Sequence, residues 1–345
     1  MNGMTKEERQ GLGALLDSAP QESVMERIPQ FRQAEIHNLS PMPERIPGEL
    51  GILVFNMERG VHLEEIKDFL RFSPDVSPFD VILANELDDG CARSGGRDAA
   101  REVAEAFGLN YVFGLEFIEL ANGEDPKGFH GNAVFSRWPI RRAEVLRLPE
   151  QYNWYFDRQR RIGGRCAVFA ELEIGGRAVG AVSVHLENRT HGEGRQAQMS
   201  AVLREAERMF PGMPVFLGGD LNTNTFDGRD KEDIGIIASS PEARRRCLED
   251  VFAYEPLLPE VLAAGYACVP EEPKLTRRKP LPGGDFLPLR LDWIMPRLAR
   301  PVRSRMISTR AGDFAFAPPG SALASFTGPE LSDHNAVWAA CRLED

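Results

Sequence analysis

The chain has 345 residues, of which 42% are hydrophobic, so a sizeable core is expected and global disorder is not. Its formal net charge of −11 argues against a protein that binds nucleic acid through a broad basic surface, although an active site needs only a local positive patch. The N-terminus has no signal-peptide pattern, and no apolar run approaches ~20 residues. The five cysteines are odd in number and widely spaced, so they predict neither a disulfide framework nor a thiolate metal site. We therefore expect a cytoplasmic protein without a transmembrane segment.

Residues 1–48 mix helix-forming stretches with several prolines. We interpret them as an N-terminal helical extension packed on one large domain, residues 49–345. Where this domain begins, Ile52–Phe55 is a short continuous apolar run, and Val81–Ala84 is a second. Such runs are typical of strands that are buried on both faces.

Helices are predicted between and after these strands. Leu63, Ile66 and Leu70 recur at helical spacing, and residues 97–107 predict a helix that Gly108 terminates. A longer helix is predicted for residues 196–210. Ser240 followed by Pro241 predicts a helix start, with Ser as the cap and Pro in the first turn.

The remaining apolar runs predict further strands, with Gly175-Gly176 as a tight hairpin turn between two of them. Because helices and strands interleave while some strands are joined by hairpins, the sheets should be mixed. The predicted strands are Tyr111–Phe117, Ala133–Ser136, Cys166–Leu172, Ala178–Leu186, Val215–Leu217, Leu289–Met295 and Ala336–Cys341.

Polar side chains lie at the ends of the most apolar strands or inside them. Each has a purely structural alternative: a turn for Asn56, Asp220, Asn222 or the Asp333-His334 pair, and a satisfied core histidine for His185. An ionisable group in an apolar run is unfavourable by several kcal/mol unless it is paired or bound to a metal. One shared site explains the whole set better than separate coincidences. The set comprises Asn56, Glu86, His185, Asp220, Asn222, Asp292, Asp333 and His334.

This set of residue types indicates a particular chemistry. Oxygen ligands without thiolates favour Mg²⁺ or Mn²⁺ over zinc. A carboxylate beside an imidazole indicates a histidine that is held in one orientation and kept basic or charged. A metal, imidazoles and a separate Asp are what phosphoester hydrolysis requires, because charge must be neutralised, water deprotonated and the leaving oxygen stabilised.

The ordered motifs resemble the endonuclease/exonuclease/phosphatase superfamily of DNase I-like, metal-dependent phosphoesterases. The resemblance spans residues 51–341 and implies an α/β, four-layer α/β/β/α sandwich in which two mixed sheets are flanked by helices. The matching segments are Phe55-Asn56, Asn85-Glu86, Gly131-Asn132-Ala133-Val134-Phe135-Ser136-Arg137, Val184-His185-Leu186, Gly219-Asp220-Leu221-Asn222, Leu291-Asp292-Trp293-Ile294 and Ser332-Asp333-His334.

The resemblance also implies roles for the matched residues. Glu86 and Asn56 would hold the metal, with Asp333 as a further ligand, and one or two metal ions would fit this expectation. His334, oriented by Asp292, would act on the water or on the phosphate.

The other matched residues would surround the reacting phosphate. Asp220 and Asn222 would position the nucleophile and the phosphoryl oxygens, and His185 would contact the phosphate or assist the leaving group. Either Asp220 or His334 could be the general base.

A run of arginines and aromatic residues between 137 and 165 is either a substrate-binding surface or a solvated hairpin with buried aromatic anchors. The basic run Lys274–Lys279 has the same two interpretations. From this region and the neighbouring motif, we expect His130, Asn132 and Arg165 to contact substrate.

The expected function is that of a divalent-metal-dependent phosphodiesterase of nuclease type. The alternative is a phosphatase or phospholipase C-type hydrolase of a lipid, inositol or other small phosphoester, and a non-catalytic binding module is a further alternative. Leu87 and His185 stand where abasic-site enzymes carry Thr and Tyr, and Thr223-Asn224 replaces the Tyr-Arg of inositol polyphosphate 5-phosphatases. The partner is therefore a phosphoester, whether nucleic acid, lipid or small molecule, and the oligomeric state is open.

Overall fold

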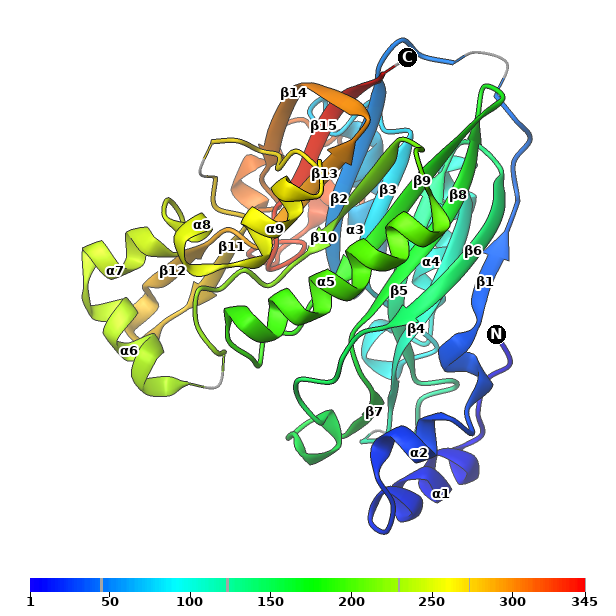
Figure 1. Cartoon of the computed structure of the whole chain (residues 1–345), viewed down its shortest axis with the longest axis vertical. Helices are drawn as coiled ribbons and strands as arrows, with labels where there is room; N and C mark the ends of the chain where they lie inside the picture. Colours follow the sequence, from blue (N-terminus) through cyan, green and yellow to red (C-terminus); the bar gives the residue numbers. More distant parts are fainter. Residues whose placement is uncertain (44–45, 122–123, 229, 273, 345) are drawn as a thin grey trace.

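Two mixed β-sheets pack face to face in a computed structural model of the chain, with helices on the outer face of each sheet (Figure 1). The structure describes residues 1–43, 46–121, 124–228, 230–272 and 274–344. The predicted four-layer α/β/β/α sandwich is confirmed. Residues 44 and 45 of the predicted extension lie outside the described residues.

Strands from both ends of the chain share the first sheet, in which β2 and β3 run parallel at the centre. Its strands, in spatial order, are β1 (Ala34–His37), β4 (Asn110–Glu119), β5 (Phe129–Ser136), β3 (Val81–Asp89), β2 (Leu50–Arg59), β15 (Ala336–Leu343) and β14 (Ala299–Ile307), with β7 (Arg161–Gly163) paired to β4.

The second sheet places β9 and β10 in parallel and pairs β10 with β13 in the antiparallel direction. Its order is β13 (Asp292–Arg297), β10 (Val215–Asp220), β9 (Arg177–His185), β8 (Cys166–Ile174) and β6 (Ile140–Arg147).

The central strands are continuously apolar because both of their faces are buried. In β2, Ile52 and Val54 belong to the cluster between the sheets, whereas Leu53 and Phe55 pack under the helices of the first sheet. The two sheets approach closely at Gly114, where an added Cβ would lie 2.6 Å from Val168.

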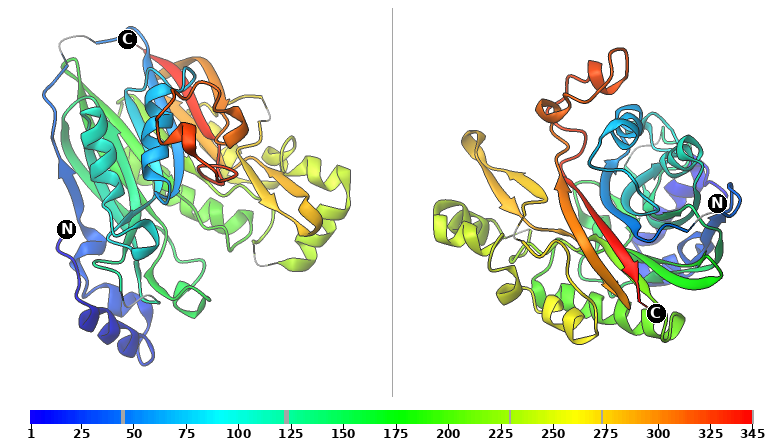
Figure 2. Two further views of the ribbon diagram at one scale, coloured as in Figure 1. Left: turned by 180° about the vertical axis from the view of Figure 1, so that it is seen from behind. Right: turned by 90° about the horizontal axis from the view of Figure 1, so that it is seen from above.

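Helices cover the outer faces, as the view from behind shows for the first sheet (Figure 2). The predicted stop at Gly108 is confirmed by its left-handed φ of 60°, and Asp98 caps the start of the same helix. The helices are α3 (Leu63–Phe72) and α4 (Ala99–Phe107) on the first sheet, and α5 (Gly192–Met209), α8 (Val251–Tyr254) and α9 (Leu257–Ala263) on the second.

An arm projects beside the sandwich (Figures 1 and 2). It contains α6 (Lys231–Ser239), α7 (Pro241–Arg246) and the hairpin of β11 (Arg277–Pro280) and β12 (Phe286–Leu289) around a small apolar cluster. Ser240 caps α7 and Pro241 opens it, as predicted.

The N-terminal segment contains α1 (Lys6–Leu16), α2 (Gln21–Met25) and the edge strand β1, so it adds a strand as well as helices to the sandwich. Short 3₁₀ turns occur at Pro29–Arg32, Ala92–Ser94, Trp154–Phe156, Pro282–Gly284, Ala311–Asp313 and Leu323–Ser325. Within the described residues, every helix falls short of the length and apolarity needed to cross a membrane.

One predicted strand was wrong in detail, and some strands were not predicted. The expected strand Leu289–Met295 is divided, since β12 ends at Leu289 and β13 begins at Asp292. Asp292 therefore opens a strand instead of lying inside one. The strands β6 and β14 were also missed, because both lie at sheet edges and carry outward arginines that interrupt any apolar run.

Candidate functional site

Three of the predicted residues lie in one row across the second sheet. Asp220 ends β10 and is in register with His185 at the end of parallel β9. On its other side, Asp220 is in register with Asp292, the first residue of antiparallel β13. The pairing of these strands therefore brings together side chains that are far apart in the sequence, and all three residues are buried.

In the first sheet, Asn56 of β2 and Asn85 of β3 lie in register, directly before a shift in the pairing of the two strands. Asn85 joins the two sheets, since its Oδ1 accepts from the backbone N of Asp220 at 2.8 Å and its Nδ2 donates to the carbonyl of Val184 at 3.1 Å. This contact requires glycine at 219, where an added Cβ would lie 2.0 Å from the Val184 oxygen.

Glu86 and Asn222 have a left-handed backbone, with φ of 55° and 47°. For residues other than glycine this conformation is unfavourable by roughly 1–3 kcal/mol, and it persists where the surrounding structure holds it. Asn222 is held by its backbone N, which donates to Asp220 Oδ1 at 2.9 Å, and by its Nδ2, which donates to the Leu186 carbonyl at 2.9 Å. Both strained residues are in the predicted site.

His334 lies beside two carboxylates. Its Nδ1 is 2.8 Å from Asp292 Oδ2, and its Nε2 is 3.6 Å from Asp220 Oδ2. Burial alone would lower the pKa of His334, but the charges of Asp292, Asp220 and Asp333 outweigh burial and raise this pKa to about 10. The arrangement suits a histidine held in one orientation that carries positive charge.

Ser332 connects this histidine to the first sheet. Its Oγ donates to the Asn56 carbonyl at 2.7 Å and accepts from the backbone N of His334 at 3.1 Å. The Ser-Asp-His turn is therefore tied to the end of β2, which fixes where the imidazole lies.

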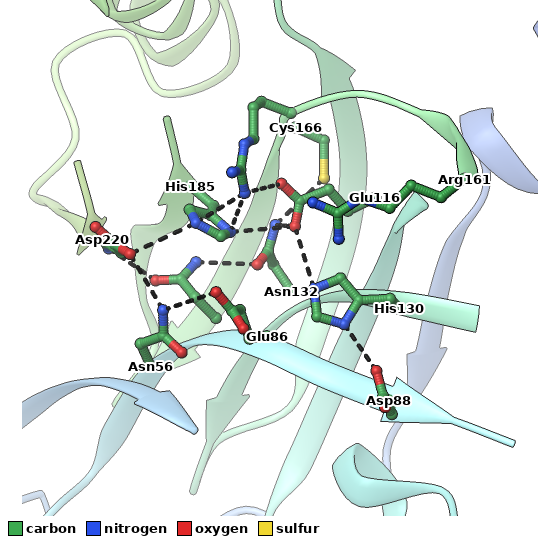
Figure 3. A network of polar contacts seen from close by, with 12 residues as sticks. Asn56, Glu86, Asp88, Glu116, His130, Asn132, Arg161, Cys166, His185 and Asp220 are labelled. Atoms are coloured by element: carbon green, nitrogen blue, oxygen red, sulfur yellow. Dashed lines mark hydrogen bonds and ion pairs between the residues drawn. The ribbon is translucent and has the colours of Figure 1, made fainter. Parts of the chain in front are cut away.

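Asn56 and Glu86 form the candidate metal side of the site, next to Asp220 (Figure 3). Asn56 Nδ2 donates to Asp220 Oδ2 at 3.1 Å and to Glu86 Oε1 at 3.3 Å. Burial raises the pKa of Glu86, but the charges of His130, His185 and nearby cationic groups outweigh it and hold this pKa well below its usual range. Glu86 is thus an ionised carboxylate facing the cleft.

The donor set fits a hard divalent cation. The carboxylates of Glu86 and Asp220 both accept from the Asn56 amide, whose Oδ1 accepts from the backbone N of Glu58 at 3.1 Å. Cys166, the cysteine of the nearby network, instead accepts from Asn132 Nδ2 at 3.4 Å, so the ligands offered are oxygen atoms. Among the described residues, ligand atoms of Asp220, Asp292 and His334 also lie within 4.8 Å of one another. Asp333, the further ligand expected from the sequence, pairs through its Oδ2 with Arg277 Nη2 at 2.6 Å.

Glu116 is the centre of a buried network that sequence reasoning missed (Figure 3). Its carboxylate lies 3.1 Å from His185 Nδ1 and 3.0 Å from Arg165 Nη1, and Asn132 Nδ2 donates to it at 3.5 Å. Burial raises the pKa of Glu116, yet the charges of His185 and Arg165 outweigh burial and hold it far below its usual range. Glu116 thereby orients three predicted residues, His185, Arg165 and Asn132.

His130 extends this network away from the cleft. Its Nδ1 is 2.8 Å from Asp88 Oδ1, and the same carboxylate binds Arg93 through two hydrogen bonds of 2.7 Å. Glu116 lies between Leu115 and Phe117 in an apolar strand, so the criterion of an ionisable group in an apolar run would have found it. Asp88 follows Glu86 in the polar second half of β3, where that criterion does not apply.

Glu86, His130, His185, Asp220 and His334 line a cleft of about 220 Å³. The arginine run of residues 137–165 is divided between two environments. Arg141 and Arg142 pair with Glu173 and Glu171 on the outer edge of the second sheet, whereas Arg161 and Arg165 line the cleft. Three arginines from outside the run also line it: Arg59, Arg189 and Arg277.

The sequence model of the Endonuclease/Exonuclease/phosphatase family matches residues 53–334. No curated protein sequence matches the chain. Among solved structures, an endonuclease/exonuclease/phosphatase from Beutenbergia cavernae DSM 12333 is similar, with 18% identity and a TM-score of 0.57 over 86% of this chain and 72% of that one.

Two other similar structures come from a protein with bound DNA and from a phosphatase. D. rerio TDP2, complexed with a single-strand DNA product, has 16% identity and a TM-score of 0.51 over 86% of this chain and all of that one. A mannosyl-6-phosphatase of Bacteroides thetaiotaomicron VPI-5482 has 14% identity and a TM-score of 0.53 over 85% of this chain and 99% of that one. At these identities the likeness concerns the fold.

Proposed function

The chain belongs to the endonuclease/exonuclease/phosphatase family, and from this premise we propose that it is a divalent-metal-dependent phosphoester hydrolase of the phosphodiesterase, nuclease-like type. The observation that carries the proposal is the convergence of the Glu86, Asn56, Asp220 and His334 side chains, which are joined by contacts of 3.3, 3.1 and 3.6 Å. The protein is assigned to the cytoplasm in this proposal, as expected from its sequence.

We assign the cation, Mg²⁺ or Mn²⁺, to Glu86 and Asn56, with Asp333 as the further ligand expected from the sequence. A divalent cation bound there neutralises charge on phosphoryl oxygens and lowers the pKa of a water ligand. The ion pair between Asp333 and Arg277 holds a guanidinium at the same rim, and its remaining N–H donors can bind phosphoryl oxygens.

The remaining residues position the reacting groups. Asp220 is the proton acceptor in this proposal, because its Oδ2 lies between two imidazoles, 3.5 Å from His185 Nε2 and 3.6 Å from His334 Nε2. His334, held by Asp292, stabilises negative charge on the phosphate, and Asn222 orients a phosphoryl oxygen. His185, held by Glu116, contacts the phosphate or protonates the leaving oxygen.

The experiment is hydrolysis of bis-p-nitrophenyl phosphate with Mg²⁺ or Mn²⁺, which EDTA should abolish. His334→Ala and Asp220→Ala should each lower the rate by a factor of ~10² or more, the usual contribution of positioned acid–base groups. Arg141→Gln, on the outer sheet edge, is the matched control and should keep the wild-type rate. Unchanged rates in both site variants would contradict the assigned roles.

The small volume of the cleft favours a second candidate, a phosphatase of a small or lipid phosphoester. A substrate panel of plasmid DNA, single-stranded RNA, phosphatidylinositol phosphates, sphingomyelin and nucleotides distinguishes the two, with His334→Ala as the control. Failure to bind Mg²⁺ or Mn²⁺ at millimolar concentration would instead favour a non-catalytic binding module.

A further inference from the structure

Arg161 lies on the wall of the catalytic cleft, next to two aromatic rings. It is only 7% exposed, and its Cζ lies 3.8 Å from the ring centroid of Phe117 and 4.0 Å from that of Trp154. These rings cover part of the guanidinium, so its N–H donors can bind a partner only at the uncovered edge. In Figure 3, Arg161 enters the network from the side opposite Asp220.

The donors of Arg161 are poorly satisfied by the protein. Within the described residues, its Nε has no hydrogen-bond partner. Its ion pair is with Glu119, whose Oε1 lies 3.7 Å from Arg161 Nη1, beyond hydrogen-bond distance, and 3.0 Å from Arg93 Nη1. One carboxylate is therefore shared by two guanidinium groups. Burial also lowers the pKa of Arg161 to about 10.

The neighbouring Arg165 is a useful contrast, because it is equally buried but fully engaged. Its Nη1 lies 3.0 Å from Glu116, and its Nε lies 3.3 Å from Glu187. A buried guanidinium is stable when it has partners of this kind. Arg161 lacks them, so its environment is complete only when another negative group is present.

Arg189 flanks the same indole and faces the same cleft. Its Cζ lies 5.0 Å from the Trp154 ring centroid, and its Nη2 lies 3.1 Å from Asp157. Like Arg161, it has an Nε without a hydrogen-bond partner among the described residues. Trp154 is itself only 5% exposed, and arginines occupy its surroundings, so it cannot serve as a platform on which a base stacks.

We propose that Arg161 and Arg189 form a second anion subsite, which binds a phosphate group of the substrate other than the one that is hydrolysed. The proposal rests on the proposed phosphoester hydrolase function and defines its substrate class further. Guanidinium groups bind phosphate with paired N–H donors, and two of them match its several oxygens. The preferred substrate therefore carries two phosphates, one scissile and one retained.

A chromogenic substrate pair isolates the second phosphate. Thymidine 5′-(p-nitrophenyl phosphate) is compared with the same compound carrying an additional 3′-phosphate, so the scissile bond and the leaving group are identical. The wild-type protein should show at least tenfold lower KM for the bisphosphate. Arg161→Met, which keeps an apolar stem beside the rings, should lose this preference while still hydrolysing the monophosphate. Arg141→Gln is the matched control and should retain the preference.

Anion binding is also measured without metal or turnover, by titrating the protein with sulfate in EDTA and following tryptophan fluorescence. Trp154 contacts Arg161 directly, so the wild-type signal should saturate. Arg161→Met should raise the apparent Kd at least tenfold, and Trp154→Phe should remove the signal. If Arg161→Met does not fold, Arg161→Lys replaces it and should weaken sulfate binding, because Lys lacks the paired donors.

The two proposals fail in different ways. If neither thymidine substrate nor bis-p-nitrophenyl phosphate is hydrolysed, the hydrolase function is overturned, and the sulfate titration still tests the subsite. If hydrolysis occurs with equal KM for the two thymidine substrates, or if Arg161→Met weakens both equally, the subsite is overturned. A sulfate titration without a saturable signal overturns it as well.

Discussion

The two sheets contribute to the site in different ways. The second-sheet side, His185, Asp220 and Asp292, is fixed by strand register and by hydrogen bonds to buried partners. The first-sheet side depends on Glu86, a residue with a strained backbone whose carboxylate accepts a hydrogen bond from Asn56. The protein therefore completes the second-sheet side with its own groups and leaves the first-sheet side available to a cation.

The largest expected effect comes from disturbing the contact between the two sides. In Gly219→Ala, the new Cβ would lie 2.0 Å from the Val184 oxygen and 2.8 Å from Asn85 Oδ1, at a φ of 139° that L residues rarely adopt. We expect the free energy of unfolding to fall by about 3 kcal/mol or more, as for severe overpacking with backbone strain. Urea denaturation measures it.

The matched control is Gly235→Ala, because an added Cβ there meets no atom within 4 Å and the residue lies in α6. Its free energy of unfolding should rise by no more than about 1 kcal/mol, because Ala favours a helix more than Gly does. If Gly219→Ala and Gly235→Ala had the same free energy of unfolding, the packing of the two sheets would not depend on the close approach of Gly219 to Val184 and Asn85.

Much of the second-sheet side could be predicted from sequence, because His185 and Asp220 end apolar strands that are easy to recognise. Which strands are neighbours is set by long-range pairing, so the register of Asp220 with His185 and Asp292 could not be read from local pattern. The family resemblance predicted the fold, whereas the structure shows which residues are in register with Asp220.

The arginines show where local reading fails. The run between 137 and 165 has one composition, yet Arg141 lies on an exposed sheet edge and Arg161 lies in the cleft. The difference arises because β6 ends at Arg147 and the chain then returns to the first sheet as β7. Glu116 was overlooked although, like Glu86, it is an ionisable residue in an apolar strand.

The second prediction tests whether the first-sheet side accepts a cation. Mg²⁺ or Mn²⁺ should raise the unfolding free energy of the wild-type protein, by about 2.7 kcal/mol at a free concentration a hundredfold above Kd. Glu86→Gln should lose most of this increment because it removes the ionised ligand. Thermal unfolding with metal and with EDTA measures the increment. The control Glu173→Gln, on β8 and paired with Arg141, should retain it, and a full increment in Glu86→Gln would assign the cation elsewhere.

The third prediction concerns charge on the second-sheet side in metal-free protein. Because carboxylates raise the pKa of His334 to about 10, its protonated form stabilises the fold. That contribution is complete below the unfolded pKa of ~6.5 and is lost as the pH rises toward about 10. In EDTA, unfolding free energy should therefore fall with pH more steeply in wild type than in His334→Gln. Parallel profiles from urea denaturation would contradict this electrostatic description.

The smallest expected effect is at the rim, where Arg277 of the arm pairs with Asp333 across a partly exposed contact. Such pairs contribute only ~0–1 kcal/mol, so Arg277→Gln should leave the unfolding free energy nearly unchanged. If Arg277 binds a phosphoryl oxygen in the ground state, KM for bis-p-nitrophenyl phosphate should rise several-fold while kcat changes less. Arg303→Gln, which removes an exposed pair with Glu49, is the control. If kcat and kcat/KM instead fell by the same factor, Arg277 would be one of the groups that act in the transition state. The arm would then contribute to catalysis as well as to substrate binding.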